Sequence, residues 1–127
     1  MEIEVYDFIA SNDYKNYKKA FANSLKRIMK FTKTNPNYLS KKIEIPQQTI
    51  YRYSIGENEP TISQAIKICN FFFLTLNSFI NCGIFENEEI NIEDMFLYKI
   101  ASAENQSEII KAVKNNYPNF KIEDYIK

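Results

Sequence analysis

Apolar side chains recur every three or four residues in five short segments between residues 14 and 82. This spacing places the apolar residues of each segment on one face of an α-helix. Helices this short are stable in water only when their apolar faces pack together. The periodicity therefore predicts a bundle of five short α-helices with tight turns. In the first, over residues 14–31, the apolar face consists of Phe21, Leu25, Ile28 and Met29.

Start signals mark the next four helices. Asn35-Pro36 combines a side-chain acceptor at the cap with a proline at the first helical position, and Ile45-Pro46 marks a second start. Thr61 with Gln64 forms a capping box, and Thr75 can cap the last helix. The side chains expected to face the core are Leu39 and Ile43 in the second helix, Ile50 and Tyr53 in the third, Ile62, Ala65, Ile66, Cys69 and Phe72 in the fourth, and Leu76, Phe79 and Ile80 in the fifth, which stops at Gly83.

Two more helices are expected beyond Gly83. Residues 86–89 form a polar acidic linker, and Asn91 then caps a helix. Residues 1–8 and 120–126 alternate only weakly, and each could form a short strand or a helical turn. In the helix that Asn91 caps, the apolar face consists of Ile92, Met95, Phe96 and Ile100. In the helix that follows and ends at Pro118, it consists of Ile109, Ile110, Val113 and Tyr117.

The composition argues against most enzyme and metal chemistry. The chain has no His, which removes the commonest general base and the commonest transition-metal ligand. Two Gly residues leave no room for a glycine-rich phosphate loop. The two cysteines form neither a disulfide framework nor a zinc site, so Cys69 is expected to be an inert core thiol and Cys82 an exposed thiol without function. No catalytic residue, metal or cofactor is therefore expected.

The sequence also predicts a cytoplasmic protein without a membrane partner. Its start, Met1-Glu2-Ile3-Glu4, lacks the basic and apolar regions of a signal peptide. Its most apolar run, Phe71-Phe72-Phe73-Leu74, is far shorter than the ~20 residues of a membrane span.

A formal net charge of zero hides an uneven distribution of charge. The chain has 16 basic and 16 acidic residues, but residues 15–52 contain ten basic residues and a single acid, Glu44. Acids outnumber bases over residues 81–127. Such asymmetry suggests a polyanionic partner for the basic block, although a solvated, lysine-rich helix face explains the charge equally well.

Residues 21–80 resemble the lambda-repressor-like, Cro/C1-type helix-turn-helix domain, also called the XRE family. The resemblance implies a compact five-helix domain whose third helix enters the major groove of DNA. We therefore expect an all-α protein with an N-terminal arm (1–13), the helix-turn-helix domain (14–82), and an acidic linker with a two-helix extension for dimerisation or interaction (83–127). The positions that carry the resemblance are Phe21, Leu25, Ile28, Lys30, Leu39, Ile43, Ile45, Thr49-Ile50, Arg52-Tyr53, Gly56, Glu59-Pro60-Thr61, Ile68, Leu76 and Phe79-Ile80.

The third helix carries side chains suited to reading base edges. Gln47 and Gln48 can pair with the N6/N7 edge of adenine, and Thr49 can offer a hydroxyl or a methyl group. The Gln47-Gln48-Thr49-Ile50 run is similar to the base-reading segment of some phage repressors in this family. Tyr51 and Arg52 are expected at the groove edge, where Arg can bind guanine or a phosphate.

Contacts with the DNA backbone are expected from the second helix and its surroundings. The candidate phosphate-binding groups are the side chains of Lys33, Lys41 and Lys42 and the amides near Asn35 and Asn37 at the helix start. Such contacts fix affinity and position and do not read sequence.

Four departures from the family pattern weaken the expected DNA contact. Pro36 replaces a Gln that usually touches a phosphate, and Pro46 replaces a Ser cap. Glu44 replaces the glycine of the turn, and the loop Glu57-Asn58-Glu59 is acidic where the family is often basic. These acids leave open a protein-binding module on the same scaffold, such as an anti-repressor, an antitoxin or a phage-encoded inhibitor.

The phenylalanine run at residues 71–73 is a further departure, because Phe73 stands where the family often has Gly. A 60-residue core is not expected to bury all three rings. They form either a hydrophobic interface, with a second copy or with the C-terminal helices packing back, or simply extra core.

These observations together predict a sequence-specific regulator that binds double-stranded DNA. The resemblance implies a dimeric repressor of phage or mobile-element type, bound to a palindromic operator. No small-molecule substrate is evident.

Overall fold

The structure, a computed structural model, describes residues 13–84 and 91–126, and all the secondary-structure elements in these ranges are helices. This confirms the all-α prediction. The predicted N-terminal arm and the acidic linker at residues 86–89 lie almost wholly outside the described residues. Residues 120–126 contain a helical turn and no strand. The elements are α2 (Asp13–Thr32), α3 (Pro36–Ile43), α4 (Gln47–Ser54), α5 (Ile62–Phe71), α6 (Leu76–Ile84), α7 (Ile92–Ala101), α8 (Gln106–Asn116) and the 3-10 helix η1 (Ile122–Asp124).

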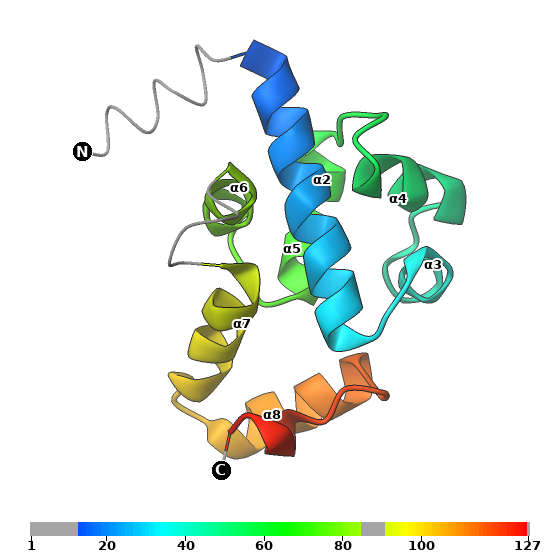
Figure 1. Cartoon of the computed structure of the whole chain (residues 1–127). Helices are drawn as coiled ribbons and strands as arrows, with labels where there is room; N and C mark the ends of the chain where they lie inside the picture. Colours follow the sequence, from blue (N-terminus) through cyan, green and yellow to red (C-terminus); the bar gives the residue numbers. More distant parts are fainter. Residues whose placement is uncertain (1–12, 85–90, 127) are drawn as a thin grey trace, which may run out of the picture.

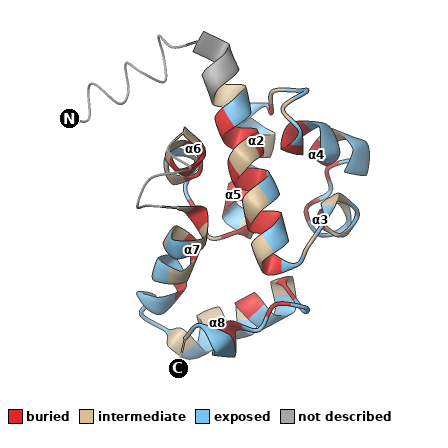
Figure 2. Ribbon diagram, viewed as in Figure 1, coloured by how far each residue is buried: buried red, intermediate tan, exposed pale blue. Residues whose placement is uncertain are grey.

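The long helix α2 forms the centre of the molecule (Figure 1). It packs against α6 and α7 on one side and against α4 on the other. In Figure 1, α3 and α4 lie together at one flank, and α8 passes beneath the C-terminal end of α2. Figure 2 shows that buried residues line the inner faces of these helices.

Side-chain caps set several of the helix starts, as predicted. The side chain of Asn35 accepts a hydrogen bond from the backbone N–H of Tyr38 at 2.8 Å, and Asn91 accepts one from Asp94 at 2.9 Å. The hydroxyl oxygen of Thr61 accepts a hydrogen bond from the N–H of Gln64 at 3.2 Å. Each cap satisfies a backbone N–H that has no partner within its own helix.

The buried face of α5 differs from the prediction. Ala65 and Cys69 are fully buried as expected, but Ile62 is 70% exposed and Ile66 44% exposed. The helix instead buries Ile68, and Ala65, Ile68 and Cys69 together form its buried face. Ile66 lies roughly 100° around the helix from Ala65, outside this buried face.

The placement of Cys82 is a second correction. Its side chain is 5% exposed, so the prediction of an exposed thiol is wrong. Gly83 lies within α6, one residue before its end, and the last turn of α6 therefore still packs against α2. Burial raises the pKa of both thiols, that of Cys69 to about 12. Cys69 is thus the inert core thiol that the sequence predicted.

The close packing of α2 on α6 depends on Gly83. A Cβ atom at this position would lie 1.9 Å from the carbonyl oxygen of Ala20. Two hydrogen bonds fix the same interface. The Asn23 amide donates to the Gly83 carbonyl at 3.2 Å, and the Ser24 hydroxyl donates to the Phe79 carbonyl at 2.5 Å. Glycine is therefore required where the two backbones meet.

The C-terminal helices pack back onto the phenylalanine run. Tyr117, at the end of α8, is fully buried, and its ring contacts Phe71, Phe72 and Phe73. Its hydroxyl donates a hydrogen bond to the Phe71 carbonyl. Phe72 is itself fully buried. Among the interpretations of the run, the structure supports extra core for Phe72 and intramolecular packing by the extension.

The extension also packs against the end of α2. Phe31 contacts the rings of Phe96, Phe120 and Tyr125. Nearer the middle of α2, Arg27 forms an ion pair with Glu93 of α7 at 2.9 Å. The helix-turn-helix region and the extension consequently share one continuous hydrophobic core.

No single helix within the described ranges is long and apolar enough to span a membrane. The pair α5 and α6, bent by 87°, meets the length and composition requirement only when its two helices are taken together.

Candidate nucleic-acid interface

The turn at residues 44–46 joins α3 to α4, and apolar contacts hold the two helices against the domain. Ile45 of the turn is buried, together with Leu39 of α3 and Ile50 and Tyr53 of α4. Because an α-helix has 3.6 residues per turn, burying Ile50 and Tyr53 leaves the opposite side of α4 facing outward.

The outward side of α4 carries most of the residues predicted to read bases. Gln47, Gln48, Tyr51 and Arg52 are exposed, whereas Thr49 is half-buried at the edge of the face. The side chains of Gln47 and Gln48 make no hydrogen bond to any residue that the structure describes. Their amide groups are therefore available to a partner.

Arg52 also lies beside an acid. Its Nε atom is 3.6 Å from a carboxylate oxygen of Glu57, and both side chains are about half exposed, at 50% and 58%. An exposed ion pair of this kind contributes about 1 kcal/mol or less. The acidic loop noted in the sequence thus competes directly for one of the predicted DNA contacts, without blocking it.

The predicted phosphate-binding residues lie around α3. Lys33, Asn35, Asn37, Lys41 and Lys42 are all exposed. The side-chain oxygen of Asn35 is engaged as the helix cap, and Lys33 has a left-handed backbone with φ 57° in the turn that precedes α3. The helix α3, which carries or directly follows these residues, packs directly on α4.

Tyr38 is a residue of this region that the sequence analysis did not single out. Its hydroxyl donates a hydrogen bond of 2.7 Å to the carbonyl of Asn116, at the end of α8. The ammonium nitrogen of Lys42 lies 5.7 Å from the centre of the Tyr38 ring, within cation–π range. The spacing of four residues between Tyr38 and Lys42 signals their proximity on one helix face. No local signal points to Asn116.

Glu44 ends α3 in the left-handed conformation, with φ 58° and ψ 42°. A side chain there crowds the backbone, which explains why glycine suits this turn. We therefore predict that Glu44→Gly raises the free energy of unfolding by about 0.5–1 kcal/mol, measured by urea denaturation.

Two control variants separate backbone strain from charge. Glu44→Gln keeps the strained backbone and is expected to leave stability within about 0.5 kcal/mol of the parent chain. Lys41→Gly places glycine inside α3 and is expected to cost about 1 kcal/mol. A Glu44→Gly variant that unfolds as readily as Lys41→Gly would contradict the assignment of strain to Glu44.

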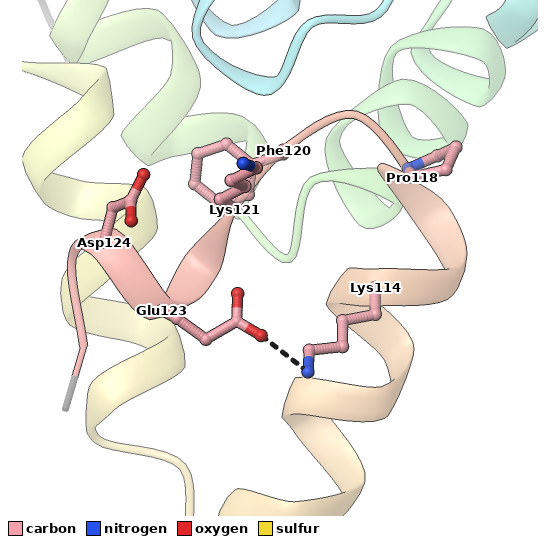
Figure 3. A pocket seen from close by; sticks show the side chains of 6 residues that line it. All are labelled: Lys114, Pro118, Phe120, Lys121, Glu123 and Asp124. Atoms are coloured by element: carbon pink, nitrogen blue, oxygen red, sulfur yellow. Dashed lines mark ion pairs between the residues drawn. The ribbon is translucent and has the colours of Figure 1, made fainter.

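A pocket of about 530 Å³ lies between α8 and η1 (Figure 3). An ion pair of 2.7 Å between Lys114 and Glu123 crosses it, and the hydrogen bond from Lys114 lowers the pKa of the Glu123 carboxyl. Phe120 and Pro118 form the apolar part of the pocket wall. The charges that line the pocket are balanced, Lys114 and Lys121 against Glu123 and Asp124, so the pocket favours neither an anion nor a cation. This pocket shares no residue with the α3–α4 surface.

No cluster of three or more His, Cys, Asp or Glu side chains that could hold a metal ion occurs in residues 13–84 and 91–126.

Two short helices that pack on the core through one face, are joined by a tight turn, and carry exposed amide side chains on the second have the arrangement of a helix-turn-helix motif. Residues 25–79 match a family model described as Helix-turn-helix. This segment, less than half of the chain, is similar to the Cro/C1-type (XRE) helix-turn-helix family of DNA-binding transcription regulators, whose members are not typically enzymes. No curated protein and no solved structure matches the chain significantly.

Proposed function

We propose that this chain is a sequence-specific transcription regulator that binds double-stranded DNA as a dimer and acts as a repressor of phage or mobile-element type. The observation that carries the proposal is the surface of α4. Ile50 and Tyr53 anchor the helix in the core, while Gln47 and Gln48 project outward without partners in the described part of the chain. This is the arrangement of a recognition helix in the major groove.

Base recognition is assigned to the outer face of α4. The amides of Gln47 and Gln48 each form paired hydrogen bonds with an adenine edge, and Thr49 contacts the neighbouring base from the rim of that face. Arg52 and Tyr51 lie one turn further along and contact the groove edge. Arg52 exchanges its exposed Glu57 partner for a guanine or a phosphate.

Phosphate contacts are assigned to the surroundings of α3. Lys33, Lys41 and Lys42 neutralise backbone charge, and the start of α3 near Asn35 and Asn37 supplies amide donors. These contacts supply affinity that falls with salt and is the same for every sequence.

The proposed dimer binds two half-sites of a palindrome, separated by about one helical turn, ~34 Å. Exposed apolar side chains are available for contact between two copies: Ile62 and Ile66 on α5, and Tyr125 in the extension. Sedimentation of the full chain at several concentrations, with and without a palindromic duplex, tests this stoichiometry.

Selection of bound duplexes from a random library, followed by a salt titration, tests the proposal directly. A repressor of this kind enriches a short palindrome. The logarithm of its affinity falls linearly with the logarithm of salt concentration, with a slope that reflects several neutralised phosphates. A library that shows no enrichment at low salt refutes DNA recognition.

The double variant Gln47→Ala, Gln48→Ala is predicted to weaken binding to the selected duplex by about 2–4 kcal/mol while binding to random duplex stays the same. Both positions are exposed and alanine favours helix, so the fold is retained. Fluorescence anisotropy on selected and random duplexes measures the difference.

Lys42→Ala is the matched control for that experiment. It is expected to weaken binding to both duplexes equally and to reduce the salt slope by about 1. If the two glutamine substitutions also weaken both duplexes equally, they do not read bases.

A protein partner is the second candidate for the same surface. The Arg52–Glu57 ion pair favours a protein partner, because Glu57 partly neutralises the positive charge that Arg52 would offer to DNA. Exposed Glu44 adds a second negative charge next to α4. Failure to select any duplex would favour this candidate.

A further inference from the structure

One side of α3 is anchored in the core, and the other is tied to the C-terminal extension. Leu39 and Ile43 are buried in the shared core, whereas Tyr38 is half-buried and reaches the end of α8. Its hydroxyl donates to the Asn116 carbonyl at 2.7 Å, between residues 78 positions apart in the chain. This bond attaches the extension to the helix that carries the proposed phosphate contacts.

The acceptor of that bond is held rigidly. Asn116 immediately precedes Tyr117, which is fully buried. The hydroxyl of Tyr117 donates to the carbonyl of Phe71, and its ring packs against Phe96 as well as the phenylalanine run. The N–H of Tyr117 also donates to the Val113 carbonyl at 2.9 Å. A carbonyl placed beside such an anchor has little freedom to move.

The donor side connects directly to a predicted phosphate contact. The Tyr38 ring lies under the ammonium group of Lys42, 5.7 Å from the ring centre. A lysine side chain on an exposed helix face samples many rotamers, and a ring at this distance favours those in which the ammonium group stays near it. Fixing the ring through its hydroxyl therefore restricts Lys42 before DNA arrives.

The C-terminal end of α2, just before α3, packs on the extension as well. Phe31, two residues before Lys33, contacts Phe96, Phe120 and Tyr125 of the extension. The extension thus contacts the chain on both sides of Lys33, through Phe31 before it and Tyr38 after it.

We propose that Tyr38 is a positioning residue for the DNA backbone contact, through which the C-terminal extension holds α3 and Lys42 in place to receive a phosphate. The proposal rests on the proposed function. It assigns the extension a role within each copy of the chain that is separate from dimerisation. The ligand class is the phosphodiester backbone of duplex DNA, so the contribution is independent of base sequence.

Tyr38→Phe in the full chain tests this assignment, because it keeps the ring and removes only the hydroxyl that reaches Asn116. Affinity is expected to fall about three- to tenfold, equally on the selected and on a random duplex, with a smaller salt slope. Tyr98→Phe is the matched control, since Tyr98 is 66% exposed on α7, and it is expected to leave binding unchanged. Thermal unfolding of each variant fixes a temperature at which all of them are folded.

A double-mutant cycle with Lys42→Ala distinguishes positioning from a general loss of stability. If Tyr38 acts through Lys42, Tyr38→Phe costs less than twofold in the Lys42→Ala background. Additive losses, an unchanged affinity in Tyr38→Phe, or a change in base preference would each overturn the inference. A parent chain that binds no duplex would instead refute the proposed function, and the inference with it.

Discussion

Replacing Gly83 by Ala is expected to lower the free energy of unfolding by more than about 3 kcal/mol. The added Cβ atom would lie 1.9 Å from the Ala20 carbonyl oxygen and 2.8 Å from the Ala20 Cα. These are backbone atoms of α2, so no side chain can rotate away to make room. The helices must separate, which also stretches the hydrogen bonds from Asn23 and Ser24 to α6. Urea denaturation followed by circular dichroism measures the loss.

Gly56→Ala is the matched control, at the other glycine of the chain. It has φ +74°, and a Cβ there meets only the Ala22 Cβ at 3.7 Å, an ordinary contact. Its cost is backbone strain alone, about 1–2 kcal/mol. If Gly83→Ala were no more costly than Gly56→Ala, the close approach of α2 and α6 would be wrong.

Tyr117→Ala is expected to cost about 3–5 kcal/mol. The side chain is fully buried, and its ring contacts five phenylalanines from three segments of the chain: the run at residues 71–73, α7, and the stretch that follows α8. Removing it leaves a cavity where α8 meets the phenylalanine run, and the extension loses its main anchor. Chemical denaturation measures the loss, and proteolysis is expected to cut the extension before residues 25–79.

Tyr117→Phe keeps the ring and removes only the hydrogen bond to Phe71, so it is expected to lower the free energy of unfolding by about 1–2 kcal/mol.

The Tyr117 hydroxyl also makes the stability depend on pH. Burial raises the pKa of the Tyr117 hydroxyl above the ordinary value of 10.0, so above about pH 10 the unfolded chain loses this proton more readily than the folded one. Stability therefore falls as pH rises beyond 10, and Tyr117→Phe is expected to reduce that fall. If Tyr117→Ala cost no more than Tyr117→Phe, the ring would not anchor the extension.

The starts of helices could be read from the sequence because capping is local. Asn35, Thr61 and Asn91 each bind a backbone N–H three residues ahead, so the whole interaction lies within four residues. The same holds for the left-handed turn at Glu44, where the missing glycine was visible in the sequence and the strained φ is seen in the structure.

The burial of individual faces was less predictable. Ile62 and Ile66 fit a helical apolar pattern as well as Ile68 does, yet only Ile68 is buried. Periodicity identifies the helix, but a neighbouring helix decides which apolar side chains are covered. Cys82 was misassigned for the same reason, because the last turn of α6 is covered by α2.

The sequence by itself determined the series of short helices, the helix-turn-helix register and the two glutamines on the outer side of α4. Each of these depends on residues within one or two helical turns. Only the tertiary structure decided that Gly83 must be glycine, that the extension covers the phenylalanine run, and that Tyr38 is tied to Asn116. These contacts join residues that lie 46 to 78 positions apart or depend on the fit of two surfaces, which no local pattern encodes.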